Sequence, residues 1–357
     1  MHIRGLGRSS IIGAMKAAVI TRQGAPVAPN VQVVDDWPQP TAGPGQVLIK
    51  TEAAALNHLD LWIGRGLPGV DLKYPCISGS DGCGIVESVG QGIDQSWIGK
   101  RVVLNAAIPV ADQTRPQSNP TLPDLRMIGE HEPGTMAQHF VVPAQNVLDI
   151  GDANAVDAAA FGLTHLTAWR MLWTKACLEP GQSVLITGIG GGVALAALNL
   201  ARHFGCTTIV TSRHQWKLDE ALKLGADHAV LDAGEDFSGE VRKLTGKRGV
   251  DVCVDSIGRA VHQSCIKSLA RGGVFVTCGC TTGPDAVTDL ARLFWNQCSI
   301  IGSTMGDMNE FGRVVALFTC GAIKPVIDTV YDAAEAPKAY ERLESGEQFG
   351  KVVIRWP

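Results

Sequence analysis

The stretch SVLITGIGGGVALAALNLA at residues 183–201 decides the fold. It opens with an apolar run typical of a buried strand and passes through glycines at 188, 190, 191 and 192. It then continues with small and apolar residues at helical spacing. A strand, a glycine turn and a helix in this order bring backbone N–H groups and the positive helix end together, with no side chains in the way. The stretch therefore predicts a dinucleotide-binding unit, with Ala194 at the last small position of the fingerprint.

Strands and helices alternate after this unit. Strands are expected at 207–211, 229–231, 250–255 and 273–278, and helices at 193–204 and 216–224. This alternation is typical of a parallel sheet covered by helices on both faces, so we predict an α/β fold with a doubly wound sheet.

The chain before this region has a different pattern, with short strands and few helices. Short β-prone runs at 31–34, 46–50, 84–89, 101–105 and 137–142 are separated by Gly, Pro and Asp, which predicts a partly closed all-β domain. Residues 109–128 are polar and rich in proline, and we expect a long surface loop there.

The length of 357 residues is enough for two domains. We expect a flexible leader at 1–14, a β-rich domain formed by 15–150 and 305–357, and a dinucleotide-binding domain at 151–304. The tail from Gly306 onward mixes helix and strand, and we expect it to pack onto the β-rich domain.

The composition indicates which classes of partner and which cellular compartment to expect. A net charge of −4 gives no electrostatic reason to expect nucleic acid or an acidic membrane surface. No apolar stretch reaches the ~18–20 residues that span a bilayer. The ten cysteines form no C-x-x-C pair, and several lie within apolar runs. We expect buried free thiols in a reducing, cytoplasmic compartment.

The end of the second predicted strand indicates which dinucleotide binds. Dinucleotide sites specific for NAD place an acidic residue there, about 20 residues beyond the glycines, to bind the ribose 2′-hydroxyl. This chain has Ser212, Arg213 and Lys217 instead, which suit the 2′-phosphate of NADPH. The alternative is that Arg213 and Lys217 are solvated residues at a helix start, although cations are unfavourable there.

Several further motifs extend over almost the whole chain. They are ALNHLD at 55–60, GSDGCGIVESVG at 79–90, GTMA at 134–137, LTAWR at 166–170, KLDEALKLGAD at 217–227 and GEQFGKVV at 346–353. With these motifs the chain resembles the medium-chain dehydrogenase/reductase superfamily, in its quinone-oxidoreductase-like branch. The resemblance implies a Rossmann domain and a GroES-like β-rich catalytic domain that is split in sequence.

The resemblance also implies which residues bind NADP(H). Besides the glycine loop and the basic segment, the loops after the later strands and the returning tail are expected to contribute. The implied residues are Thr167, Gly190, Gly191, Gly192, Val193, Ser212, Arg213, Lys217, Asp255, Ser256, Ile257, Cys278, Gly279, Thr304, Met305, Phe349, Gly350 and Lys351.

Zinc alcohol dehydrogenases of this superfamily bind a catalytic zinc through Cys, His and a further Cys or Asp. The corresponding positions here are Asn57, Ser80 and Leu163, which supply neither thiolate nor imidazole. The segment that corresponds to the structural zinc lobe, 105–130, contains no cysteine. We therefore expect no metal.

Hydride transfer without a Lewis acid suits acceptors that are already electron-poor. We therefore predict an NADPH-dependent reductase of a quinone or α,β-unsaturated carbonyl, with Asn57, His58 and Asp60 as catalytic candidates. For Asn57 a cap on backbone groups is the alternative role, and for His58 a structural one.

Two other functions stay open at this point. One is a zinc alcohol dehydrogenase that uses His58, Asp60 or Asp81, and the other is a non-enzymatic NADPH-binding scaffold or sensor. The resemblance also implies a homodimer or homotetramer, in which the run 298–301 forms an edge strand.

Overall fold

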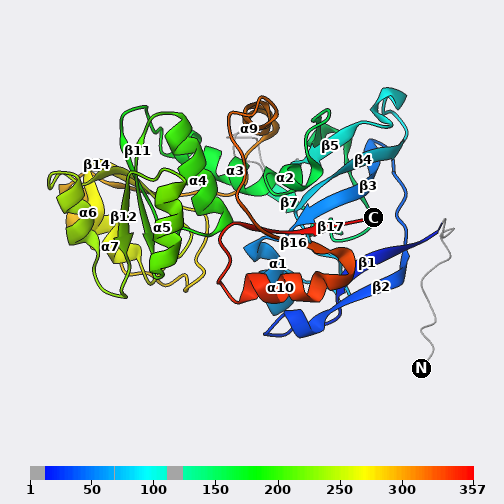
Figure 1. The fold of residues 1–357 in the computed structure, drawn as a ribbon, viewed down its shortest axis with the longest axis horizontal. Coiled ribbons are helices and arrows are strands. Elements are labelled where there is room, and N and C mark those ends of the chain that lie inside the picture. Colours follow the sequence, from blue (N-terminus) through cyan, green and yellow to red (C-terminus); the bar gives the residue numbers. More distant parts are fainter. Residues whose placement is uncertain (1–12, 68, 111–123) are drawn as a thin grey trace. The chain divides into compact units, whose positions relative to one another are not determined.

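The computed structural model describes residues 13–67, 69–110 and 124–357 and divides into two compact units. Unit 1 comprises Met1–Ala159, Thr329–Gly346 and Val352–Pro357, and unit 2 comprises Ala160–Asp328 and Glu347–Lys351. Most of the predicted leader, residues 1–12, lies outside the described part of the chain. Each unit is described by itself below (Figure 1).

Unit 2 is built on a six-stranded sheet in which every pair of neighbours is parallel. The strand order is β12-β11-β10-β13-β14-β15. In this doubly wound order, successive strands are added toward one edge from β10 to β12 and toward the other edge from β13 to β15. The α/β prediction is thereby confirmed. The bounds are β10 Ser183–Ile186, β11 Thr207–Ser212, β12 His228–Leu231, β13 Val250–Asp255, β14 Leu269–Thr277 and β15 Ser299–Gly302.

Helices lie against this sheet, and α3 and α9 pack together in the same unit (Figure 1). The helix α4 begins directly after Gly191, and its alanines and leucines are buried because α4 packs against α3 as well as against β10, β11 and β13. The bounds are α3 Gly162–Trp169, the π-helical turn η4 Arg170–Lys175, α4 Gly192–His203, α5 Gln215–Lys223, α6 Ser238–Leu244, α7 His262–Ser268, α8 Leu290–Trp295 and α9 Met308–Thr319.

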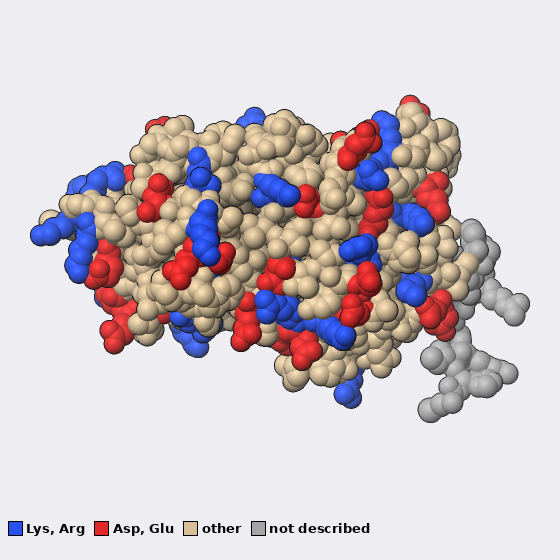
Figure 2. Space-filling view, in the orientation of Figure 1, with Lys and Arg blue, Asp and Glu red and all other residues tan. Residues whose placement is uncertain are grey.

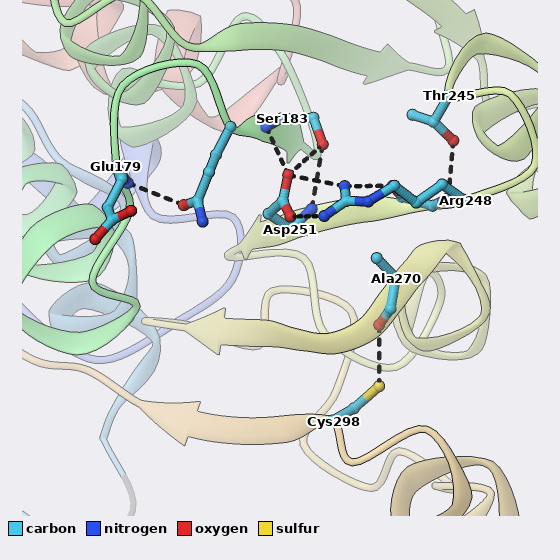
Figure 3. Close-up of polar contacts among 9 residues, drawn as sticks. Glu179, Ser183, Thr245, Arg248, Asp251, Ala270 and Cys298 are labelled. Carbon is cyan, nitrogen blue, oxygen red and sulfur yellow. Dashed lines mark hydrogen bonds and ion pairs between the residues drawn. The ribbon is translucent and has the colours of Figure 1, made fainter.

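A polar network fastens the amino ends of β10 and β13 (Figure 3). The carboxylate of Asp251 accepts hydrogen bonds from the backbone N–H and the hydroxyl of Ser183, both at 2.9 Å, and from the guanidinium of Arg248. These bonds hold the two central strands in register at the end of the sheet opposite the glycine loop.

Unit 1 is rich in β-structure. Its largest sheet has the order β16-β17-β3-β4-β5-β9, and β8 pairs with the first half of β3; two small sheets pair β1 with β2 and β6 with β7. The bounds are β1 Ala14–Ile20, β2 Val31–Pro38, β3 Gln46–Ala55, α1 His58–Arg65, β4 Asp81–Val89, β5 Arg101–Leu104, β6 Ala107–Val110, β7 Asp124–Met127, β8 His139–Pro143, β9 Val147–Asp149, α2 Ala155–Ala159, β16 Ile327–Asp332, α10 Ala336–Glu344 and β17 Lys351–Arg355; short 3-10 turns are η1 Ala28–Asn30, η2 Gln95–Trp97, η3 Ala144–Asn146 and η5 Ala333–Glu335.

One helix was not predicted, and two expectations differ from the structure. The segment after Leu56 is the helix α1, because Asn57 and Asp60 satisfy the first backbone groups of the helix. The expected loop at 109–128 begins and ends in the paired strands β6 and β7, while 111–123 lie outside the described residues. The helix α9 belongs to unit 2 rather than to the β-rich unit, because Phe318 stacks on Phe161 at 4.7 Å.

Surface charge, helix length and the edge strand of the six-stranded sheet are relevant to the partners that were predicted or excluded from the sequence. Basic and acidic side chains are interspersed over the face shown in Figure 2. In the described ranges, no helix has the length and apolar character needed to cross a bilayer. The run predicted as an edge strand is β15, which lies at one end of the six-stranded sheet. Its pairing across a two-fold axis remains a prediction.

Candidate active site

The glycine loop of unit 2 has the backbone that its sequence requires. Gly188 and Gly190 have φ angles of 64° and 110°, which L side chains rarely adopt. The carbonyl of Gly190 accepts a hydrogen bond from the N–H of Gly350 at 3.0 Å, so the returning tail contacts the loop.

Gly191 is the open position of this loop. A Cβ built on it would meet only the carbonyl oxygen of Gly188, at 3.6 Å, whereas one on Gly192 would meet Thr164 at 2.8 Å and Lys351 at 3.1 Å. Gly191 is also the residue from which α4 begins, followed by Val193 in the first turn. The loop therefore offers a cradle at a helix N-terminus that fits a pyrophosphate.

The basic segment lies at the carboxyl end of β11, next to this loop. Ser212 is buried and its hydroxyl accepts a hydrogen bond from the N–H of His214 at 3.2 Å, while Arg213 is exposed. Lys217 is 6% exposed, and its Cδ lies 2.8 Å and its Nζ 3.4 Å from the position of a Cβ on Gly190. Of the two cations of this segment, Lys217 lies beside the glycine loop and Arg213 lies at the end of the neighbouring strand β11.

A carboxylate follows the neighbouring strand and was not considered from the sequence. Asp232 comes directly after β12, and its backbone N–H donates to the carbonyl of Ser212 at 2.9 Å. Its Oδ1 accepts from the N–H of Gly234 at 3.0 Å, which gives the side chain a turn-stabilising role.

The loop after β13 is held by Asp255. This buried carboxylate accepts from the Thr187 hydroxyl at 2.6 Å and from the N–H groups of Ile257 and Gly258, and burial raises its pKa. The side chain of Ile257 in turn lies against Gly188, 2.6 Å from the position of a Cβ there. Asp255 therefore fixes the shape of the loop. Ser256 and Ile257 lie in this loop, and Ile257 contacts the glycine loop.

The loop after β14 contains the two cysteines separated by one residue. Gly279 lies between them and packs over Ser256. Burial, with the nearby charge of Asp255, raises the pKa of Cys278 to about 12. A thiol with so high a pKa carries little thiolate, which argues against a redox role.

The helix α3 brings a second group of predicted residues together. The Thr167 hydroxyl donates to the carbonyl of Leu163 at 2.7 Å and lies 3.5 Å from the sulfur of Met305. The loop that carries Thr304 and Met305 thus reaches the Thr167 side of the helix.

A buried ion pair fixes this loop and was missed in the sequence. Arg170 Nη1 lies 2.5 Å from Glu310 Oε2, and Glu310 also accepts from the N–H of Asp307 at 2.8 Å. Because Asp307 follows Met305 closely, the pair anchors the loop to the π-helical turn η4. The two residues are 140 positions apart, so the sequence offered no signal for the pairing.

Next to Thr167, the helix contains a buried histidine. His165 Nδ1 lies 3.2 Å from the carbonyl of Phe161, and its ring stacks on the Phe161 ring at 4.6 Å. Burial, helped by the charge of Lys351, lowers the pKa of His165 to about 3, so the imidazole is neutral near pH 7. It therefore acts as a packing residue rather than an acid.

In unit 1 the catalytic candidates form a buried polar cluster. Asn57 begins α1, and its N–H donates to Asp60 Oδ2 at 2.7 Å. Its side-chain Nδ2 donates to Asp81 Oδ2 at 2.9 Å. All three residues are buried; Asp81 orients the side-chain amide of Asn57, and Asp60 holds its backbone N–H. Asn57 thus caps the start of α1 and also holds a side-chain amide in a fixed orientation.

The candidate His58 and two tyrosines of unit 1, whose side chains can also carry a proton, lie in different surroundings. His58 is exposed and meets the Trp62 ring edge-on at 5.7 Å, and partial burial with the nearby Arg65 lowers its pKa. The Tyr74 hydroxyl donates to the carbonyl of Ile63 at 2.5 Å. Tyr340, which the sequence did not indicate, is fully buried with its hydroxyl 2.5 Å from Ser78 Oγ, and burial together with Asp60 raises its pKa.

The positions that correspond to zinc ligands fit a metal poorly. The nitrogen of the Asn57 amide donates to Asp81, the Ser80 hydroxyl donates to the carbonyl of Ile128 at 2.7 Å, and Leu163 has no ligating atom. Across 13–67, 69–110 and 124–357, no three His, Cys, Asp or Glu side chains gather as metal ligands would.

Comparison with known proteins agrees with this fold. The model of the alcohol dehydrogenase GroES-like domain matches residues 43–152, and that of the zinc-binding dehydrogenase matches residues 192–319. The zinc-type alcohol dehydrogenase-like protein YogA of Leptosphaeria maculans is 32% identical over 334 residues, which cover 88% of this chain and 92% of that protein.

Solved structures are similar over nearly the full length. An NAD-dependent alcohol dehydrogenase has a TM-score of 0.87 at 34% identity, covering 96% of this chain and 99% of that one. The crotonyl-CoA carboxylase/reductase AntE, solved in complex with NADP, has a TM-score of 0.85 at 25% identity, covering 99% and 97%. This chain is an oxidoreductase and belongs to the medium-chain dehydrogenase/reductase superfamily.

Proposed function

We propose that this protein is an NADPH-dependent reductase that acts without a metal on a quinone or an α,β-unsaturated carbonyl. The observation that carries the choice of NADPH is the basic segment after β11. Arg213 is exposed at the strand end, and Lys217 is buried against Gly190. Two cations at this position favour a ligand with an additional phosphate, because guanidinium and ammonium groups both bind phosphate oxygens.

The similar proteins do not decide between the two cofactors. One similar structure is named an NAD-dependent alcohol dehydrogenase, and another was solved in complex with NADP. The local chemistry of Ser212, Arg213 and Lys217 therefore carries the proposal, together with the turn role of Asp232.

The polar cluster of unit 1 supports the proposed acceptor class. Bound NADPH supplies a hydride, and an enone or quinone acceptor takes up negative charge on its oxygen. An amide N–H is a suitable donor to such an oxygen, and a donor fixed in advance loses little energy to reorganisation. Asn57 is fixed in this way, because Asp81 orients its side chain and Asp60 holds its backbone.

Zinc would change the chemistry that the protein can perform, since a metal lowers the pKa of a bound alcohol. The similarity to a zinc-type alcohol dehydrogenase-like protein keeps alcohol oxidation as the second candidate. The donor chemistry of Asn57, Ser80 and Leu163 favours the metal-free reductase.

One experiment separates the two candidates. The purified protein is assayed for NADPH oxidation with a panel of quinones and enones, and for NADP+ reduction with primary and secondary alcohols, before and after dialysis against a chelator. We expect turnover with the electron-poor acceptors, unchanged by the chelator. Near-stoichiometric zinc, with alcohol oxidation lost on chelation, would contradict the proposal. Tight NADPH binding without turnover of any acceptor would favour a scaffold or sensor.

A further inference from the structure

Trp216 is an exposed aromatic residue at the nucleotide side of unit 2. It lies in the first turn of α5, and 44% of its surface is exposed. A tryptophan so exposed contributes little to the core of the unit. Its ring nevertheless has two defined neighbours, the Lys217 Nζ at 5.4 Å and the Phe349 ring at 6.1 Å.

Lys217 occupies an electrostatically unfavourable position. It is the third residue of α5, where the helix dipole is positive and repels a cation. Its aliphatic carbons run along Gly190, which leaves its ammonium next to the glycine loop. The face of an indole attracts an ammonium at the distance observed and offsets part of that repulsion.

Phe349, the aromatic neighbour of the Trp216 indole, lies on a segment whose backbone is held by hydrogen bonds. The N–H of Phe349 donates to Asp328 Oδ1 at 2.9 Å, and the next residue, Gly350, donates to the carbonyl of Gly190 at 3.0 Å. The segment that carries the phenylalanine is therefore fixed to the same loop that Lys217 contacts. Trp216 thus contacts both this segment and the Lys217 ammonium.

We propose that Trp216 is a specificity-determining residue, which positions the Lys217 ammonium for the 2′-phosphate of NADPH. This inference rests on the proposed NADPH dependence. Without the indole, the ammonium loses one of the groups that position it beside the glycine loop, and the phosphate meets a less well ordered donor. NADH has no 2′-phosphate, so its binding depends little on Trp216.

The test is a comparison of dissociation constants on the full-length protein. We expect Trp216→Ala to raise the Kd for NADPH about fivefold and to change the Kd for NADH less than twofold, as loss of one cation–π contact implies. Trp216→Phe, which keeps an aromatic face, is expected to restore most of the NADPH affinity. Leu222→Ala is the matched control, because Leu222 is 43% exposed on the same helix.

The outcomes separate this inference from the proposed function. Equal weakening of NADPH and NADH by Trp216→Ala, or no weakening of either, would overturn the role of Trp216. A wild-type preference for NADPH that is lost in Arg213→Ala but undiminished in Trp216→Ala would overturn it while leaving the proposed function intact. A wild-type protein that binds both cofactors equally would remove the NADPH proposal itself.

Discussion

Gly191→Val is expected to abolish nucleotide binding while leaving the protein folded. The backbone of Gly191 has φ −75° and ψ 152°, a conformation that valine adopts readily. A Cβ there meets only one protein atom, at 3.6 Å, so the added methyl groups project into the space that a pyrophosphate would occupy. The N-terminus of α4 then loses its contacts with the ligand, and we expect the Kd for NADPH and for NADH to rise at least about 100-fold.

The matched control is Gly239→Val in α6, where a Cβ also meets no neighbour. Calorimetric titration measures both affinities, and urea unfolding measures stability. Both variants are expected to unfold within about 1 kcal/mol of the wild type. Full nucleotide affinity in Gly191→Val would show that the glycine loop only turns the chain.

Asn57→Asp is expected to remove catalysis without affecting nucleotide binding. The substitution keeps the shape of the side chain and a good helix cap, but it replaces the amide donor by a carboxylate. That carboxylate would face Asp81 at the present donor–acceptor distance of 2.9 Å, so the variant loses the donor and gains a repulsion. We expect kcat/KM for the quinone or enone acceptor to fall at least about 100-fold, the effect of losing one oxyanion donor.

Asn154→Asp provides the control within the same unit. Asn154 also begins a helix, and its Oδ1 accepts from the N–H groups of Val156 and Asp157 at 3.0 and 3.1 Å. This variant is expected to keep wild-type kcat/KM, since an aspartate caps a helix as well as an asparagine does. If Asn57→Asp retained full kcat/KM, the role of Asn57 would be limited to starting α1.

The fold was predictable because its signals are local. The apolar run of β10, the glycines that follow and the helix behind them lie within 183–201 and specify one structural unit. The order of the remaining strands follows from parallel pairing with right-handed connections. The basic residues after β11 could also be located, since they occur at a fixed distance from the glycines.

What could not be predicted depends on contacts between distant residues. Asn57 and Asp60 form a helix-starting pattern, but α1 is only eight residues long, and no helix was predicted there. The orientation of the Asn57 amide depends on Asp81, which is 24 positions away. The place of α9 depends on the stacking of Phe318 on Phe161, which an amphipathic pattern does not specify.

The most direct test of the central claim compares the dissociation constants for NADPH and NADH in the wild type and in Arg213→Ala. Arg213 is exposed at the end of β11, so its removal is expected to leave stability unchanged. We predict that the wild type binds NADPH at least about tenfold more tightly than NADH, and that Arg213→Ala loses most of this preference by weakening NADPH alone. Equal affinities for the two cofactors in the wild type would contradict the assignment of NADPH.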